Sequence, residues 1–375
     1  MKTFNIILVM LVLASVLIAQ SKDMTRTFEV EKGVTLNTRI NPGDIVVKTW
    51  DKNEILVKIK GLDSDEHEDV DIYEKSNTLF VKYNSSYGWS DDLTFDFTVP
   101  INCHLELNTT GGDITLKNDL TGRVSLNTSG GDIEMKNVSG KLQVNTSGGD
   151  IEVGDVNGPT ILATSGGDIK VKTIRGESAS IKTMGGDIDI VEVDSDVDAT
   201  TYGGDIHIGD IGGKAIAKTF GGDVELGNVT GSAKMETYGG NLELKSATGE
   251  VYADTKGGDI TLRNVKGSLN AKTAGGRILA ELDPSGNGIT KLKSAGGNII
   301  LILPADAKAD IDASIRIRGS WGRHKDDYSI ESDFMKDKPS ITEDRKEIKS
   351  EFSINGGGEK IMISTVNSNI QIKKK

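Results

Sequence analysis

Eleven Gly-Gly pairs recur through the middle of the chain, and their spacing restricts the possible folds more than any other feature. Among the first ten pairs each step is 18 or 19 residues, and the last step is 21 residues. A fixed period of this size is typical of solenoids, in which each repeat contacts only its neighbours. The pairs begin at Gly111, Gly130, Gly148, Gly166, Gly185, Gly203, Gly221, Gly239, Gly257, Gly275 and Gly296.

Each repeat contains two short segments in which apolar and polar residues alternate. In the repeat that starts at Gly148, Ile151 and Val153 share one side of the first segment, and Thr160, Leu162 and Thr164 share one side of the second. Alternation with period two between glycines is typical of β-strands. Two strands per repeat leave no room for helical crossovers or for four-stranded propeller blades. We therefore predict an all-β fold, a parallel β-solenoid (β-helix) with two short strands per coil of about 18 residues.

The inward positions of successive repeats are apolar, so stacked coils would form one continuous core. Strand alternation points only about six side chains per coil inward, and several of these are alanine. We therefore expect a narrow, filled interior, with any binding on an outer face. The residues three after each pair are Ile114, Ile133, Ile151, Ile169, Ile188, Ile206, Val224, Leu242, Ile260, Ile278 and Ile299.

A hydroxyl stands two residues before every Gly-Gly pair, at Thr109, Thr128, Thr146 and each equivalent position through Thr273 and Ser294. Strand parity places this threonine column inward beside the corner. A hydroxyl both donates and accepts, so it can bond from coil to coil or cap the corner backbone. We interpret the column as structural.

An acidic residue follows most of the pairs, with Asn241 and Asn298 at two positions and Arg277 at one. A stack of carboxylates could bind calcium, because like charges at strand spacing repel unless they are neutralised. The alternative is an Asx-type turn, in which the side chain accepts from the corner backbone. Substitution by asparagine favours the turn, and we expect no metal site. The column contains Asp113, Asp132, Asp150, Asp168, Asp187, Asp205, Asp223 and Asp259.

The residue immediately before Gly-Gly is large in four consecutive repeats: Met184, Tyr202, Phe220 and Tyr238. Stacked coils would align these side chains as an outward strip beside the corner. One interpretation is a stack that satisfies itself, and the other is an exposed surface for a glycan or a protein partner. These four residues are the candidate interaction strip.

No arrangement of residues typical of catalysis is found, and we expect neither a catalytic residue nor a cofactor. His67, His104, His207 and His324 lie in unrelated contexts. A carbohydrate-active enzyme on a β-helix stays an alternative, because carboxylates are abundant and Arg277 interrupts the acidic column. Such an enzyme needs carboxylates or bases positioned for acid–base chemistry.

Residues 1–20 have the pattern of a secretory signal peptide, with Lys2, an apolar run from Phe4 to Ile18, and small residues at Ala19-Gln20-Ser21. We expect export to the periplasm or cell surface, with no membrane insertion after cleavage.

The net charge of −12 argues against a nucleic-acid partner. Cys103 is the only cysteine, which excludes an intrachain disulfide, and its parity predicts a buried side chain.

Beyond the signal, we expect irregular coils or a β cap over 24–100, regular repeats over 101–304, and further coils over 305–375. The last segment has a polar excursion and a charged tail, and we expect its final coil to close the solenoid. Asn41-Pro42-Gly43-Asp44-Ile45 is a degenerate version of the repeat corner.

The repeat resembles the bacterial family known as "putative adhesin", a domain of unknown function. The resemblance rests on Thr-Ser-Gly-Gly-Asp-Ile at 128–133 and 146–151, Asn-Val-Ser-Gly at 137–140, and the closing Ile-Asn-Gly-Gly-Gly at 354–358. It covers roughly residues 40–375, and it implies a β-helical fold and an envelope location. We therefore expect a non-enzymatic structural or adhesive scaffold whose partner is an envelope protein or glycan. A partner protein in envelope stress or signalling is a further alternative.

Overall fold

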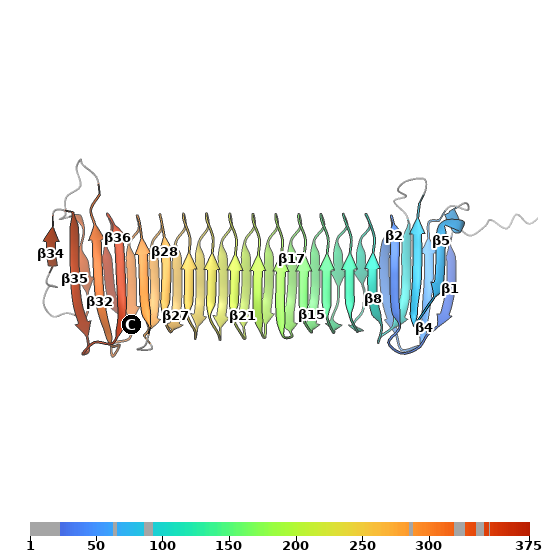
Figure 1. The fold of residues 1–375 in the computed structure, drawn as a ribbon, viewed down its shortest axis with the longest axis horizontal. Helices are drawn as coiled ribbons and strands as arrows, with labels where there is room; N and C mark the ends of the chain where they lie inside the picture. The colour runs from blue at the N-terminus through green and yellow to red at the C-terminus, as the bar shows by residue number, and fades with distance from the viewer. Residues whose placement is uncertain are drawn as a thin grey trace, which may run out of the picture.

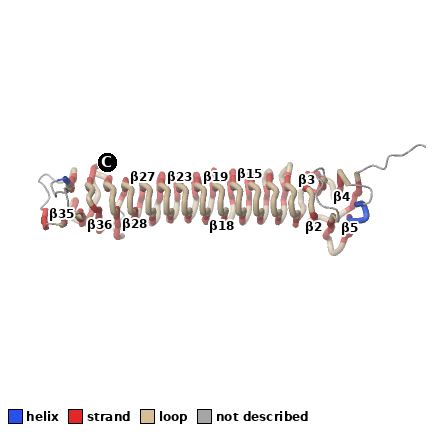
Figure 2. Tube along the Cα trace, turned by 90° about the horizontal axis from the view of Figure 1, so that it is seen from above, coloured by secondary structure: helices blue, strands red, loops and turns tan. Residues whose placement is uncertain are grey.

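The computed structural model describes residues 23–62, 66–85, 93–284, 288–318, 327–334, 341–344 and 346–375. The expected signal peptide therefore lies outside the described residues, as does His324. The chain forms a long rod of stacked coils, and two β-sheets run along its length (Figure 1). Seen from above, the middle of the rod is a regular succession of equal coils (Figure 2). This is the predicted parallel β-solenoid.

Both sheets are parallel through the middle of the rod, and each coil contributes to both. Neighbouring strands pair residues 18 or 19 positions apart, as with Ile133 opposite Ile114 and Ile151. The order in the first sheet is β1 (Met24–Glu29), β4 (Glu54–Lys60), β7 (Thr94–Pro100), β3 (Asp44–Trp50), β9 (Ile114–Leu116), β12 (Ile133–Met135), β15 (Ile151–Asn157), β17 (Ile169–Arg175), β19 (Ile188–Val193), β21 (Ile206–Ile211), β23 (Val224–Val229), β25 (Leu242–Ala247), β27 (Ile260–Lys266), β29 (Ile278–Asp283), β31 (Ile299–Leu303), β37 (Ile370–Lys374) and β33 (Ile330–Ser332). The short strands β10 (Leu120–Thr121) and β13 (Val138–Ser139) continue the coils of β9 and β12.

The second sheet faces the first across the core. Its order is β5 (Val70–Glu74), β6 (Thr78–Asn84), β2 (Thr35–Asn41), β8 (His104–Asn108), β11 (Val124–Asn127), β14 (Leu142–Asn145), β16 (Thr160–Ala163), β18 (Ser178–Lys182), β20 (Asp196–Thr200), β22 (Ala215–Lys218), β24 (Ala233–Glu236), β26 (Val251–Asp254), β28 (Leu269–Thr273), β30 (Ile289–Ser294), β36 (Glu359–Val366), β32 (Ala309–Arg316), β35 (Glu347–Ile354) and β34 (Ile341–Asp344). The 3-10 turn η1 (Glu66–Asp69) precedes β5.

The core is a set of straight apolar columns between the two sheets. Every residue three after a Gly-Gly pair is buried, from Ile114 to Ile299. Alanines such as Ala199 and Ala217 are also fully buried on the opposite strand, which keeps the two sheets close together. Full burial of an isoleucine stabilises the fold by about 1.5–3 kcal/mol, so each coil gains from its member of this column.

The second glycine of each pair is needed because the backbone of the preceding coil lies too close to leave room for a side chain. A Cβ on Gly131 would lie 2.2 Å from the carbonyl oxygen of Gly112, whereas a Cβ on Gly130 would have 3.8 Å to its nearest neighbour. Neither residue has a positive φ. A glycine at a corner can serve either a positive φ or a close backbone approach, and at this corner the structure shows close approach.

At the two ends of the rod, the strands do not stack in the order in which they follow along the chain. At the first end, β2 and β3 lie against the regular stack, and β6 and β7, which come later in the chain, lie outside them. At the other end, β36 and β37 lie directly against β30 and β31, and β32 and β33 lie beyond. The expectation that the final coil closes the solenoid is therefore wrong. Along the length of the rod, the C-terminus therefore lies before the end of the stack, and β34 is at the tip (Figure 1).

Candidate functional site

The candidate interaction strip follows four consecutive strands of the second sheet. Met184, Tyr202, Phe220 and Tyr238 each stand two residues beyond the end of β18, β20, β22 or β24. Their side chains are 48–58% exposed. The structure therefore brings all four predicted residues together on the outer surface, beside the Gly-Gly corner.

The three aromatic rings of the strip are stacked face to face. Ring centroids are 5.0 Å apart for Tyr202 and Phe220, and 5.1 Å apart for Phe220 and Tyr238, with interplanar angles of 2° and 3°. The ammonium of Lys256 lies 5.9 Å from the Tyr238 centroid. Each ring thus covers the face of its neighbour, and the strip presents mainly ring edges to solvent. This is the self-stacking arrangement, and it coexists with substantial exposure.

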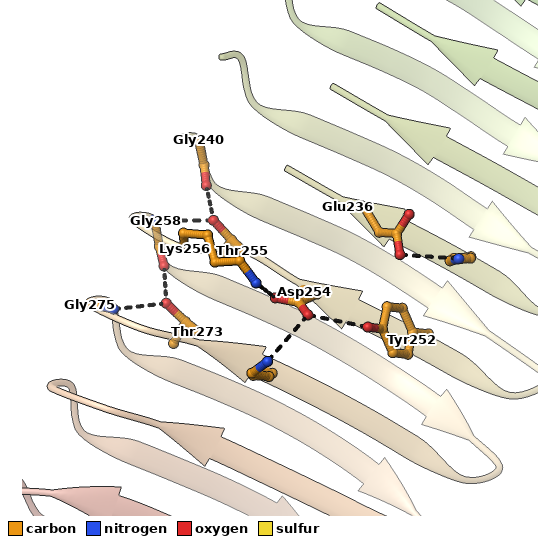
Figure 3. A network of polar contacts seen from close by, with 11 residues as sticks. Glu236, Gly240, Tyr252, Asp254, Thr255, Lys256, Gly258, Thr273 and Gly275 are labelled. Carbon is orange, nitrogen blue, oxygen red and sulfur yellow. Dashed lines mark hydrogen bonds and ion pairs between the residues drawn. The ribbon is translucent and has the colours of Figure 1, made fainter. Parts of the chain in front are cut away.

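A charged network adjoins the strip on the outer face of the second sheet, around Asp254 (Figure 3). The Asp254 carboxylate lies 3.2 Å from Lys256 Nζ and accepts a hydrogen bond of 3.2 Å from the Tyr252 hydroxyl. Lys234 Nζ lies 5.4 Å above the Tyr252 ring. Partial burial and the nearby Asp254 carboxylate raise the pKa of Tyr252. Sequence reasoning missed this network, although Tyr252 and Asp254 occupy alternate positions of one strand.

The threonine column joins adjacent coils through their corners. The Thr255 hydroxyl donates to Gly240 O of the preceding coil at 2.8 Å and accepts from Gly258 N at 3.3 Å (Figure 3). The same pair of bonds recurs from Thr128 to Ser294. Both roles proposed for the hydroxyl, between coils and within the corner, are confirmed.

The acidic column also bonds from coil to coil. Asp132 Oδ1 accepts from the backbone N–H of Asp150 at 2.8 Å, and its equivalents behave alike. The side chain thus accepts from corner backbone as predicted, but the corner belongs to the next coil. Asn241 Oδ1 accepts from Asp259 N at 2.8 Å, which explains why asparagine can replace aspartate.

Arg277, which interrupts the acidic column, is paired with its neighbour in the stack. Its Nε lies 2.9 Å from Asp259 Oδ2, and its backbone N–H donates to Asp259 Oδ1 at 2.8 Å. These contacts assign it a structural role. It supplies no separate support for an active site.

The remaining candidates for chemistry are dispersed along the rod. His104 Nδ1 accepts from Arg123 N at 2.9 Å, and His207 Nδ1 lies 3.4 Å from Glu225. Cys103 is buried, as predicted, and burial raises the pKa of its thiol to about 12. Among the described residues, no three His, Cys, Asp or Glu side chains are grouped to hold a metal ion.

A hollow of about 490 Å³ at β32, β35 and β36 is lined by Asp310, Asp312 and Glu351. The Ser353 hydroxyl donates to Asp310 Oδ1 at 2.5 Å, and Gly358 N donates to Oδ2 at 3.3 Å. These bonds lower the pKa of Asp310. A general acid needs the opposite shift, so Asp310 is not suited to that role.

Taken together, these features define an elongated, two-sheet parallel β-solenoid that displays a stacked aromatic strip along one corner. The chain belongs to the Toastrack DUF4097 family, whose pattern matches residues 35–211 and again residues 213–373. The junction between the two matches falls inside the regular stack, where β21 pairs with β23 as its neighbours do.

Several solved structures are similar to the chain. A putative adhesin from Parabacteroides merdae is 14% identical, with a TM-score of 0.29, over 76% of this chain and 90% of that one. A putative adhesin from Bacteroides fragilis is 12% identical, with a TM-score of 0.24, over 95% and 98%. A putative lipid binding protein from Parabacteroides distasonis is 14% identical, with a TM-score of 0.26, over 75% and 90%. No curated protein matches the chain. Within the described residues, no helix is long and apolar enough to cross a membrane.

Proposed function

We propose that this protein is an exported, non-enzymatic scaffold of the cell envelope that makes contacts through the candidate interaction strip. The observation that carries the proposal is the exposure of four large side chains in one column of four consecutive coils. Large apolar groups that share one exposed patch are typical of interaction surfaces.

The position of the strip supports an interaction role over a purely structural one. The same column holds Ser129, Ser147 and Ser165 in the three preceding coils, which stack with the same strand register. The fold therefore does not require large side chains at this corner. Ring stacking explains how the strip is ordered, but it does not explain why the rings are retained at the surface.

Export is supported by residues 1–20, whose basic start, apolar run and small-residue end form a signal-peptide pattern. If the full chain is expressed in a Gram-negative host, we expect the mature N-terminus near Ser21, which N-terminal sequencing of the periplasmic fraction would reveal. Recovery of unprocessed protein in the cytoplasm would contradict export.

Binding to envelope material tests the contact surface. Purified protein starting at Ser21 is sedimented with washed peptidoglycan sacculi and, separately, with envelope membrane vesicles. We expect retention by one fraction, and at least tenfold weaker retention of the M184S/Y202S/F220S/Y238S variant. Serine at this column has three precedents in the chain, so the variant should fold.

A matched control replaces exposed apolar residues away from the strip. Ile161 and Val191 are 41% and 64% exposed, and the I161S/V191S variant should bind as the wild type does. Equal retention of the wild type and the strip variant would exclude the strip as the contact surface. Equal loss in both variants would show that general surface hydrophobicity, not the strip, governs retention.

A further inference from the structure

The ring faces within the stack are already occupied, and this restricts what can bind there. Phe220 stacks between Tyr202 and Tyr238 at centroid distances of 5.0 and 5.1 Å, and Lys256 lies over Tyr238. Sugars bind aromatic residues by packing their C–H groups on an open ring face. The ring edges that remain form an apolar rim, which favours contact with other apolar surface.

The rings of the strip also repeat along the rod at a distance that few protein surfaces share. Its rings repeat at about 5 Å because neighbouring coils are separated by the spacing of β-strands. A partner that contacts every ring edge must present apolar groups with the same repeat. A second copy of this solenoid has that repeat over the same length, so its strip matches this one ring for ring.

Charge differs on the two flanks of the strip. On the Gly-Gly side, the exposed acidic column contributes Asp187, Asp205 and Asp223. On the strand side the charges of the same coils balance: Lys182, Lys218 and Lys234 against Asp196, Asp198 and Glu236. The strip therefore separates an acidic flank from one whose charges balance.

These flank charges select an orientation for two facing strips. If the rods are antiparallel, a twofold axis across the rods places the acidic flank of one copy against the acidic flank of the other. If the rods are parallel, a twofold axis along the rods places the acidic flank of each copy against the balanced flank of the other. Like charges that face each other disfavour the antiparallel arrangement.

We propose that two copies of this protein associate side by side in parallel, with their strips packed edge to edge along a twofold axis parallel to the rods. This inference rests on the proposed role of the strip as a contact surface and adds the identity of the partner. The contact is small, so the dissociation constant should lie between about 10 µM and 1 mM. On a cell surface, where many copies share one layer, such weak contacts act together.

Sedimentation velocity over a concentration series tests whether the pair forms. The wild type should show a reversible monomer–dimer equilibrium, and the I161S/V191S control should match it. The M184S/Y202S/F220S/Y238S variant should stay monomeric at concentrations at least tenfold higher.

Cross-linking distinguishes the two orientations. Ser147 and Ala274 are exposed in the same column, two coils before Met184 and two coils after Tyr238. In the parallel pair, S147C faces S147C and A274C faces A274C, so a short bismaleimide should cross-link each variant alone. In an antiparallel pair, S147C faces A274C, and only a mixture of the two variants should cross-link. The native Cys103 is buried and should not react.

The outcomes separate this inference from the broader proposal. A wild type that is monomeric up to about 1 mM, or cross-links that form only in the mixture, would overturn the parallel pair. If the wild type is monomeric but sacculi or a defined oligosaccharide retain it through the strip, the strip binds a glycan, and the scaffold proposal stands without the pair. A dimer that persists in the strip variant places the interface elsewhere.

Discussion

At the scale of single residues, the threonine hydroxyls connect the backbone of one coil to that of the next. Thr201 is fully buried, and its hydroxyl donates to Gly186 O at 2.9 Å and accepts from Gly204 N at 3.4 Å. Thr201→Val preserves shape but leaves both backbone groups unsatisfied, so it should cost about 1–3 kcal/mol in urea unfolding. Thr201→Ser keeps both bonds and should lose about 0.8 kcal/mol for one methyl group. An unchanged stability in Thr201→Val would show that the hydroxyl contributes nothing.

The two glycines of one pair should differ sharply in their tolerance of alanine. Gly131→Ala places a Cβ 2.2 Å from Gly112 O, whereas Gly130→Ala has 3.8 Å to Gly111 O. Because backbone cannot yield as a flexible side chain can, Gly131→Ala should destabilise the protein by about 3 kcal/mol or more. Gly130→Ala should change stability by less than about 1 kcal/mol. Thermal unfolding followed by circular dichroism compares the adjacent substitutions directly, and similar midpoints would contradict close inter-coil approach.

Cys103 supplies a chemical measure of local opening. Its buried thiol has a pKa of about 12, so at pH 8 its reactive thiolate fraction is about three orders of magnitude below that of an ordinary thiol. We expect iodoacetamide to leave the folded protein unmodified for hours and to alkylate it promptly in guanidinium chloride. Mass spectrometry gives both rates, and prompt alkylation of the folded protein would show that its coil opens readily.

At the scale of strands and columns, the repeat predicts the structure well because every coil has the same environment. Stacking places the same residue at the same site, so the apolar, threonine and strip columns could be inferred from spacing alone. The acidic column was predicted less completely, since spacing shows that Asp132 lies at a corner but not which backbone N–H it reaches. The Asp254 network was missed because it joins different residue types from neighbouring coils, which no repeated column marks.

The strip should also stabilise the fold modestly, whatever it binds. Its two stacked ring pairs are each worth about 0.5–1.5 kcal/mol, so the M184S/Y202S/F220S/Y238S variant should lose about 1–3 kcal/mol. Urea unfolding measures the loss, and F220S alone should account for most of it because Phe220 belongs to both pairs. A loss confined to Y202S or Y238S would show that the rings do not act as one stack.

At the scale of the whole molecule, the order of coils in space could not be read from the chain. Gly43 and Asp44 were recognised as a degenerate corner, and Thr109 Oγ1 indeed donates to Gly43 O at 2.8 Å. The corresponding corner at the other end has no Gly-Gly pair: Thr365 Oγ1 donates to Gly297 O at 2.8 Å, and Asn369 N donates to Asn298 Oδ1 at 2.9 Å. Periodicity measures distance along the chain, so it cannot show that a coil returns after a long excursion to pair with an earlier one.

Because the chain returns in this way, its last two strands, β36 and β37, lie between other strands of the stack. β36 lies between β30 and β32, and β37 lies between β31 and β33, so each has a paired strand on both sides. Chain ends usually fray, but here the backbone amides of Ile361, Ile363 and Ile370 belong to interior strands with buried side chains. Hydrogen exchange read by mass spectrometry should therefore show residues 359–374 protected to a similar degree as the central coils, and more strongly than the edge strand β1.

Removing this coil should expose both sheets at one end of the stack. A chain that stops at residue 358 leaves β30 and β31 without their next strands, and separates β32 and β35 from the rod. Unpaired parallel edges are templates for further pairing, so the truncated protein should form large assemblies by light scattering. The strip variant serves as the control, because it retains both ends of the rod and should not form them. If the truncated chain stays monomeric while residues 289–303 remain protected from exchange, the returning coil is dispensable as a cap, and the edges of β30 and β31 are covered in another way.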